Sequence, residues 1–219
     1  LRPFSWIHCS HQLQLGLPIF VAVFCETSLF SIVGLLMAEF GTVYLAANQA
    51  AISYATLTYT IPWSISLTAT IVIGYEVGAK NFIGARQYAV LSQLTVFVLV
   101  VFTITATYLF LDPIAHIFTN DAVTFQAIRH FLLFAVIFAF FDAAGTPVQG
   151  ILRGYKDVKI ITYIAFVTYW LISIPMGYAC AHLTPYGPYG YWLSLVISLA
   201  INASALNYRL WRHTAFAQG

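Results

Sequence analysis

The sequence has very few charged residues. Lys, Arg, Asp and Glu make up 7% of its 219 residues, against about 25% in an ordinary soluble domain. A soluble chain cannot cover its surface with so few charges, so the composition predicts a protein surrounded by lipid. The formal net charge is only +2. No basic run is present, and nucleic acid is therefore excluded as an expected partner.

Cysteine and catalytic motifs are also scarce. The three cysteines (Cys9, Cys25 and Cys180) form neither a CxxC pair nor a metal-binding spacing with histidine. Cys25 is interpreted as a small apolar packing residue. The histidines fall at the ends of the apolar segments and in the loops, and GxSxG, HExxH and Walker A motifs are absent. No enzymatic activity and no organic cofactor are therefore expected.

Long apolar segments are what the sequence does contain. Windows of about 20 apolar residues, the length that crosses a bilayer as a helix, can be placed at 15–37, 46–74, 88–110, 125–151, 159–182 and 189–211. No segment shows the apolar/polar alternation of a membrane barrel. The expected fold is an all-α polytopic membrane protein with six transmembrane helices. Pro62 and Pro175 are expected to kink the second and fifth helices.

The basic residues predict the orientation of these spans. With the N-terminus inside, eight of them fall on the cytoplasmic side and only Arg129 falls outside, which is a strong positive-inside bias. Both termini are then cytoplasmic, residues 1–14 forming a lead-in and 212–219 a tail. The short loop from Arg153 to Lys159 is interpreted as a topology signal, with Gly154 closing the preceding helix.

Two carboxylates lie where a carboxylate is costly. Glu26 and Asp142 each lie about halfway along an apolar span. An ionised side chain at that depth costs roughly 2.5–3.5 kcal/mol on insertion scales, and such residues usually mark ion or proton pathways. The pair favours a Na⁺ or H⁺ site, since one bound cation relieves the repulsion between two acids. The alternative is that each acid is protonated and hydrogen-bonded to a neighbouring helix.

Polar residues recur at helical spacing in three spans. Such residues either join packed helices or line a water-filled cavity. A cavity wall is favoured for the second and fourth spans because Gln and Asp are costly to bury, whereas helix packing is favoured for the sixth. The candidate cavity-lining residues are Gln49, Tyr59, Phe138, Thr146 and Gln149. The second span also carries Ser53, Thr56, Thr60 and Ser64, and the sixth carries Ser194, Ser198 and Asn202.

Three segments of the sequence resemble one transporter family. GILRGYKDVK (150–159), GYEVGAKNFIGAR (74–86) and LGLPI (15–19) resemble the multidrug and toxic compound extrusion (MATE) family, in particular its Na⁺-coupled, NorM-type bacterial branch. The resemblance runs from about residue 13 to 211 and covers only the C-terminal half of that family. It implies one six-helix lobe of a twelve-helix, two-lobe transporter. The N-terminal lobe is then a partner absent from this chain, which begins at Leu1 and not at Met.

The resemblance also implies site residues and a function. The cation-site acids of the family correspond to Glu26 and Asp142. Tyr59 falls where relatives carry an aromatic residue that faces cation or substrate. Phe138 stands where some relatives carry a Tyr that contributes a hydroxyl ligand. The implied function is export of cationic amphiphilic drugs across the inner membrane in exchange for Na⁺ or H⁺.

Two other functions stay open. One is a flippase of the same superfamily that moves a lipid carrier, although the spans contain no Lys or Arg in their interiors for a pyrophosphate headgroup. The other is a degenerate half-gene or a membrane scaffold without transport activity. The second reading predicts that neither Glu26 nor Asp142 matters.

Overall fold

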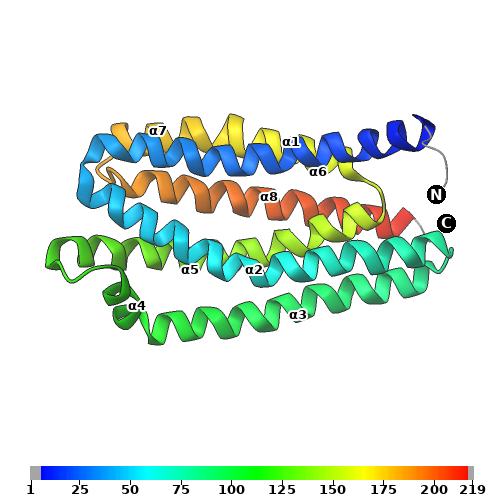
Figure 1. Cartoon of the computed structure of the whole chain (residues 1–219), viewed down its shortest axis with the longest axis horizontal. Coiled ribbons are helices and arrows are strands. Elements are labelled where there is room, and N and C mark those ends of the chain that lie inside the picture. The colour runs from blue at the N-terminus through cyan, green and yellow to red at the C-terminus, as the bar shows by residue number, and fades with distance from the viewer. Residues whose placement is uncertain (1–5, 217–219) are drawn as a thin grey trace.

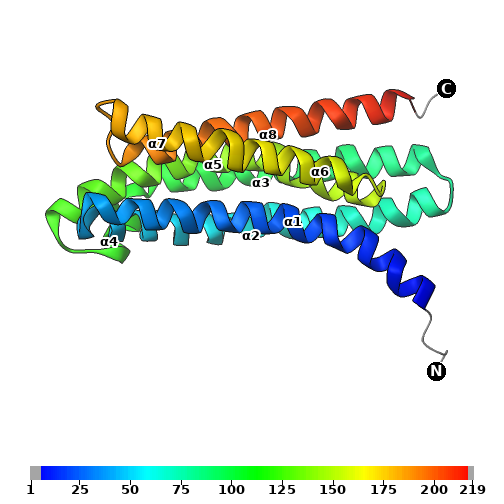
Figure 2. The same cartoon turned by 90° about the horizontal axis from the view of Figure 1, so that it is seen from above.

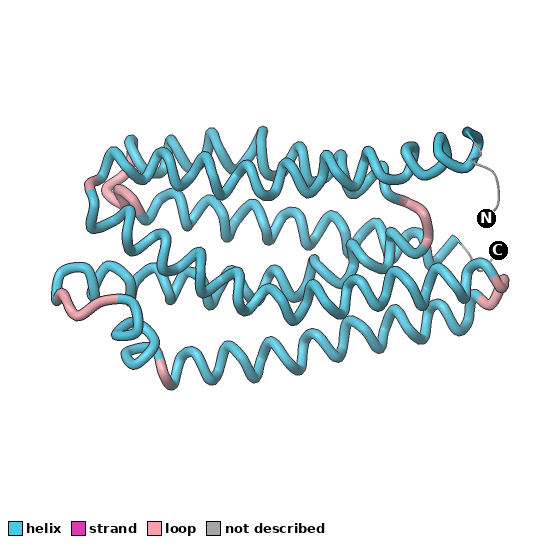
Figure 3. Tube along the Cα trace, viewed as in Figure 1, coloured by secondary structure: helices cyan, strands magenta, loops and turns pink. Residues whose placement is uncertain are grey.

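The computed structural model describes residues 6–216, and all of its regular structure in that range is helical (Figures 1 and 3). Six helical segments are long and apolar enough to cross a membrane. They are α1 (Trp6–Met37), α2 (Thr42–Gly78), α3 (Phe82–Leu109), α5 (Ala122–Gly154), the continuous segment Val158–Leu183, and α8 (Tyr189–Phe216). The fold class and the six predicted spans are therefore confirmed.

The fifth span is divided into three helical parts. It runs through α6 (Val158–Ala165), a π-helical stretch η2 (Phe166–Ser173) and α7 (Ile174–Leu183). Pro175 lies in the first turn of α7, directly after the π-helix. A proline lacks the backbone donor that a regular helix uses, and here the irregular hydrogen bonding extends over η2. In the second span, α2 contains Pro62 and changes direction about midway in Figure 1.

Several helices extend beyond the predicted spans. α1 begins at Trp6, inside the predicted lead-in, and α8 continues to Phe216, inside the predicted tail. A helix does not have to end where the bilayer ends. Figure 2 shows the first turns of α1 bending away from the other helices, and α1 contains Pro18. A proline inside a helix is a common cause of such a bend.

One further helix lies between two of the predicted spans. α4 (Leu111–Phe118) occupies most of the gap between the spans 88–110 and 125–151, where the sequence analysis placed no helix. Its Pro113 lies in the first turn, where a proline is tolerated because the first backbone N–H groups have no partner inside the helix. Leu111 is buried, and Asp112 bonds to Arg129 of α5 at 2.8 Å. The ion pair ties α4 to the end of α5.

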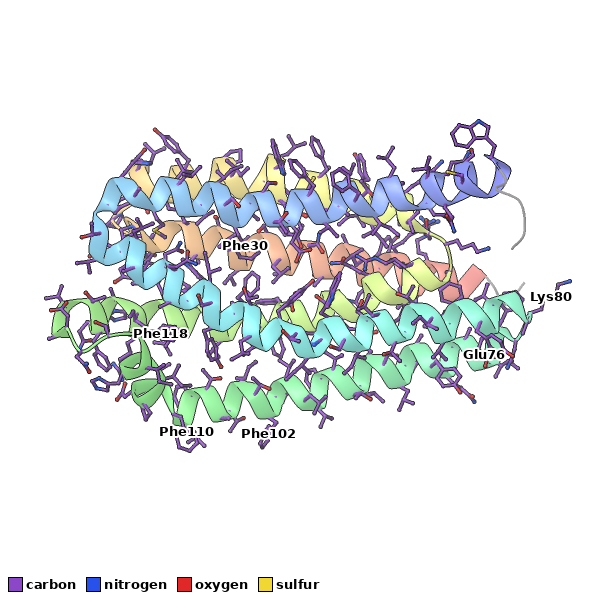
Figure 4. The ribbon with its side chains drawn as sticks, in the orientation of Figure 1. Phe30, Glu76, Lys80, Phe102, Phe110 and Phe118 are labelled. Atoms are coloured by element: carbon purple, nitrogen blue, oxygen red, sulfur yellow. The ribbon has the colours of Figure 1, made fainter. Side chains whose placement is uncertain are left out.

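Helix α5 lies at the centre of the bundle. It packs against α2, α3 and α8, and it is buried over much of its length. The outer faces of the bundle are apolar instead, as expected for a surface that contacts lipid. The side chains of Phe102, in α3, and Phe110, which directly follows α3, point away from the bundle (Figure 4) and are 74% and 59% exposed. The faces that point away from the bundle are thus largely apolar, and the buried polar side chains include Asp142, Thr146 and Asn202.

Small residues bring α2 and α5 into close contact. The Ser66 hydroxyl donates to the Thr146 carbonyl at 2.8 Å, and the Thr70 hydroxyl donates to the Gly150 carbonyl at 3.0 Å. The residue numbers of the bonded partners increase together in α2 and α5, so the two helices run parallel. Close approach of backbones at small residues, supported by hydrogen bonds between helices, is the usual way in which membrane helices associate. This contact fixes the C-terminal half of α5 against the C-terminal half of α2.

The same turn ends both of these helices. After α2, Lys80 has a φ of 61°, and Asn81 N donates to Glu76 O. After α5, Lys156 has a φ of 63°, and Asp157 N donates to Leu152 O. These are Schellman turns with lysine in the left-handed position that glycine usually takes.

The second of these turns corrects the expectation that Gly154 closes α5. Gly154 lies within the helix, and a Cβ there would approach the Ile73 side chain to 2.9 Å. Its role is therefore close packing against α2, and the left-handed position of the turn belongs to Lys156.

Both ends of the described chain lie at one end of the bundle. Figures 1 and 2 place the N- and C-termini there, together with the turn between α2 and α3. Figure 4 labels Glu76 and Lys80 at that turn. Arg209 of α8 also bonds to Asp157 at 2.7 Å, which ties the loop after α5 to α8. Arg129, near the start of α5, is paired with α4 far from the termini.

Candidate cation site in the centre of the lobe

A cavity of about 280 Å³ opens beside Glu26. Glu26 reaches it from α1 and Tyr59 from α2, and Phe138 of α5 forms part of its wall. Tyr59 and Glu26 line the same cavity, and the phenol and the carboxyl group interact electrostatically. Phe30 points from α1 into the bundle (Figure 4) and contacts Phe138 edge to face, with ring centroids 5.8 Å apart. The cavity therefore combines one carboxylate and one phenol with an aromatic and aliphatic wall.

Asp142 lies in an adjoining space. It lines a cavity of about 10 Å³, together with Tyr59 and Phe138, which is about the volume that one water molecule needs. Asp142 is only 5% exposed, and its Oδ1 accepts from the Thr146 hydroxyl at 2.7 Å. Tyr59 and Phe138 line both this space and the larger cavity. Glu26 and Asp142 thus lie in two adjoining cavities that share Tyr59 and Phe138 as lining residues.

The two carboxyl groups are near enough to interact electrostatically. Each acid also interacts with the Tyr59 hydroxyl. Oxygen ligands suit a hard cation, and two carboxylates with hydroxyl groups between them match that preference. Among the side chains that the structure describes, no three from His, Cys, Asp or Glu lie together where they could hold a metal ion. The geometry suits a proton or a small monovalent cation.

The remaining predicted cavity residues lie elsewhere. Thr146 and Gln149 are buried between helices and are not among the residues that line these cavities. Gln49 is exposed on α2, outside the same cavities. The other polar residues of that row are exposed as well, and their hydroxyls bond to carbonyls of their own helix; they are Ser53, Thr56, Thr60 and Ser64. Of these, Thr56 also lines the larger cavity. The structure brings together Glu26, Asp142, Tyr59 and Phe138.

Of the polar residues of the sixth span, Asn202 joins two helices, which is the role favoured from the sequence. The Asn202 side chain donates to the Thr168 hydroxyl of η2 at 2.9 Å. Ser194 and Ser198 are buried, and their hydroxyls bond to carbonyls one turn earlier in α8. Ser198 also lines a third small cavity, next to Glu26.

Tyr169 is a site residue that the sequence analysis missed. It lies in η2, is 4% exposed, and lines the third cavity together with Glu26 and Phe138. It also interacts electrostatically with both acids. The fifth span carries three tyrosines, at positions 163, 169 and 178, and no sequence signal distinguishes Tyr169 from the other two. π-Helical stretches are frequent at functional sites.

Arg153 and Trp63 were also missed as parts of the site. The Arg153 guanidinium lies 5.5 Å from the centre of the Trp63 ring and donates to Gln149 Oε1 at 3.2 Å. Trp63 in turn packs against Tyr59, with ring centroids 5.7 Å apart. Arg153 therefore points from the end of α5 into the bundle, toward Tyr59, and not out of the membrane.

Fold and site together define a polytopic membrane protein that holds an acidic pair near the centre of a six-helix lobe. The profile of the MatE family matches residues 18–179. The chain belongs to this family, and the resemblance noted from the sequence is confirmed.

Individual relatives agree with this assignment. The chain is 44% identical over 207 residues to a protein of Bacillus subtilis (strain 168) named "Probable multidrug resistance protein NorM", covering 94% of this chain and 46% of the relative. A protein of the same name from Oceanobacillus iheyensis is 41% identical over 210 residues, covering 96% of this chain and 47% of the relative. The chain spans about half the length of the curated relatives that it matches.

Solved structures show the same fold at lower identity. A eukaryotic MATE transporter, AtDTX14, superposes with a TM-score of 0.87 at 18% identity, covering 95% of this chain and 48% of its own. The Vibrio cholerae MATE transporter VcmN in its bent form gives 0.86 at 16% identity, covering 94% and 47%. The six helices thus correspond to about half of a MATE transporter.

Proposed function

We propose that this chain is the C-terminal half of a cation-coupled multidrug efflux antiporter. The observation that carries the proposal is the convergence of Glu26 and Asp142 on the two sides of Tyr59 and Phe138. A cation that binds these acids offsets the cost of holding two carboxylates inside the membrane. Na⁺ or H⁺ is the coupling ion, and no further cofactor or enzymatic activity is assigned.

The larger cavity supports a cationic amphiphilic substrate. Its wall is apolar and aromatic, apart from Glu26 and the hydroxyls of Tyr59, Thr27 and Thr56. An aromatic wall next to a carboxylate suits an organic cation because both the ring faces and the carboxylate attract positive charge. None of the residues that line the three cavities is Lys or Arg. This lining favours drug export over the transport of a lipid carrier with a pyrophosphate headgroup.

An N-terminal lobe is the proposed partner. The row that begins at Gln49 and ends at Ser64 is exposed on one side of α2, and a second lobe would make this face the wall of a shared, water-filled cavity. Inverted or repeated lobes that enclose a substrate near the membrane centre are common in transporters. The half-length match to the relatives supports the same arrangement. Alternation of two lobe arrangements then exposes the site to one side at a time.

The termini are proposed to face the cytoplasm of an inner membrane. Lys80 and Lys156 follow the ends of α2 and α5, at the end of the bundle that holds the termini (Figure 1). Arg129 lies at the far end of α5 and is paired with Asp112. The positive-inside rule assigns the more basic end to the cytoplasm.

Conservative replacement of the two acids tests the proposed function. The substitutions are Glu26→Gln and Asp142→Asn, made in the protein expressed from its complete reading frame, and the readout is efflux of ethidium driven by a Na⁺ or a pH gradient. We expect each variant to lose at least tenfold in cation-driven efflux, because the amide keeps the shape of the acid and removes its charge. Glu39→Gln, an exposed acid near the end of α1, is the matched control and should export normally. Unchanged efflux in both site variants would remove the proposed site.

A further inference from the structure

Arg153 points in an unusual direction for its position. It lies in the last turn of α5, and arginine near the end of a membrane helix generally extends its side chain outward to the polar interface. Its guanidinium instead turns back along the helix, past the Gln149 side chain, and reaches the Trp63 ring. Trp63 belongs to the middle of α2. The positive charge is thus directed toward the centre of the lobe.

The guanidinium is only partly satisfied in this position. Nη2 donates to Gln149 Oε1 at 3.2 Å. Nε is buried and has no hydrogen-bond partner among the described residues. A buried donor without a partner costs free energy, and hydrogen bonding alone therefore does not account for this inward conformation. A charge held inside the bundle is expected to have an opposite charge within reach.

That opposite charge is Glu26. The guanidinium interacts electrostatically with the Glu26 carboxylate and with the Tyr59 hydroxyl. Side chains connect the two charges: Arg153 stacks on Trp63, Trp63 packs on Tyr59 with ring centroids 5.7 Å apart, and Tyr59 lines the same cavity as Glu26. Three different helices, α1, α2 and α5, contribute to this series. Asp142 interacts with Glu26 on the opposite side and has no such contact with the guanidinium.

We propose that Arg153 is a tethered internal cation that competes with the coupling cation for Glu26. The proposal rests on the proposed function, since it assumes that Glu26 binds a cation. In the arrangement described here, the guanidinium offsets part of the Glu26 charge and so weakens cation binding. Turning the guanidinium away from Glu26 would relieve this competition and strengthen binding. Arg153 is thus a positioning residue that sets cation affinity without touching the bound ion.

Neutralising Arg153 should tighten cation binding. The probes are ²²Na⁺ and tetraphenylphosphonium, measured at equilibrium on the purified protein expressed from its complete reading frame. We expect Arg153→Met to bind cations roughly tenfold more tightly, a change of about 1.4 kcal/mol. Arg153→Lys should stay near the wild-type affinity because it keeps the charge. Lys159→Met removes an exposed cation at the start of α6 and should leave the affinity unchanged.

The dependence on Glu26 separates this effect from a general structural one. In the Glu26→Gln background, Arg153→Met should have no further effect on binding. The proposal is overturned if Arg153→Met binds cations as wild type or more weakly, or if its effect persists without Glu26. Arg153→Gln provides the same comparison should the Met variant not be monodisperse. If Glu26→Gln alone binds both probes as wild type does, the proposed function fails, and this result is recognised without any Arg153 variant.

Discussion

The contact between α2 and α5 gives the sharpest prediction of stability, at Gly150. A Cβ added there would lie 2.1 Å from the Ser66 carbonyl oxygen and 2.5 Å from its hydroxyl, whereas ordinary contact begins at 3.4 Å. The nearest atoms belong to the backbone, so a side-chain rotation cannot relieve the clash. Gly150→Ala must therefore push the two helices apart.

The cost follows from what that separation breaks. Overpacking a tight contact costs typically 1–3 kcal/mol. The hydrogen bonds from Ser66 and Thr70 to α5 are worth about 0.6 kcal/mol each between membrane helices. Alanine regains about 1 kcal/mol through its better helix propensity. The net prediction is a loss of about 2 kcal/mol in the free energy of unfolding.

Reversible unfolding in mixed detergent–SDS micelles measures this difference. The matched control is Gly34→Ala in α1, where a Cβ meets nothing within 4 Å, so the control should be neutral or slightly stabilising. Both variants are compared with the wild-type protein from its complete reading frame. The reasoning is refuted if Gly150→Ala unfolds at the wild-type SDS concentration, or if Gly34→Ala loses as much stability.

Two further predictions concern single hydrogen bonds. The Trp192 indole donates to Asn48 Oδ1 at 2.9 Å, and both side chains are fully buried. Trp192→Phe should therefore cost about 1–3 kcal/mol in the SDS assay. The double variant with Asn48→Ala should cost less than the sum of the two single variants, and strict additivity would contradict the prediction.

At the start of α5, the Asp121 carboxylate accepts hydrogen bonds from the Thr124 backbone N–H and hydroxyl. These bonds hold the pKa of the Asp121 carboxyl below its usual range. The stabilising effect of the ionised carboxylate is therefore present at neutral pH and lost as the pH falls through the lowered pKa. Asp121→Ala should reduce the thermal midpoint at pH 7, and this difference should close in acid. A difference that does not depend on pH would exclude the ionised cap.

The sequence predicts the spans well because length and hydropathy are sufficient for that purpose. It does not predict α4, since eight residues are too few for a transmembrane window and Asp112-Pro113 resembles a loop. It also misplaces the end of α5. Glycine is the usual residue of a Schellman turn, whereas Lys156 takes that position and Gly154 is needed for packing.

The candidate site is predictable only in part. Glu26 and Asp142 are visible because a carboxylate in an apolar span is rare. Their arrangement around Tyr59 and Phe138 depends on the packing of α1, α2 and α5, which no local pattern encodes. The direction of the Arg153 side chain depends on a ring contributed by α2, so the sequence indicates only a topology signal there.

The lysines that end α2 and α5 satisfy two requirements that conflict. The left-handed conformation of Lys80 and Lys156 would be easier for glycine, because a side chain raises its energy by roughly 1–2 kcal/mol. A glycine, however, carries no positive charge and so would not contribute to the positive-inside signal that orients a helix in the bilayer. Each lysine therefore lowers the stability of the folded state slightly but adds a positive charge that favours one orientation of its helix in the membrane. Because both helices carry a lysine at the same end, the positive-inside rule favours the same parallel orientation that the Ser66 and Thr70 bonds to α5 require.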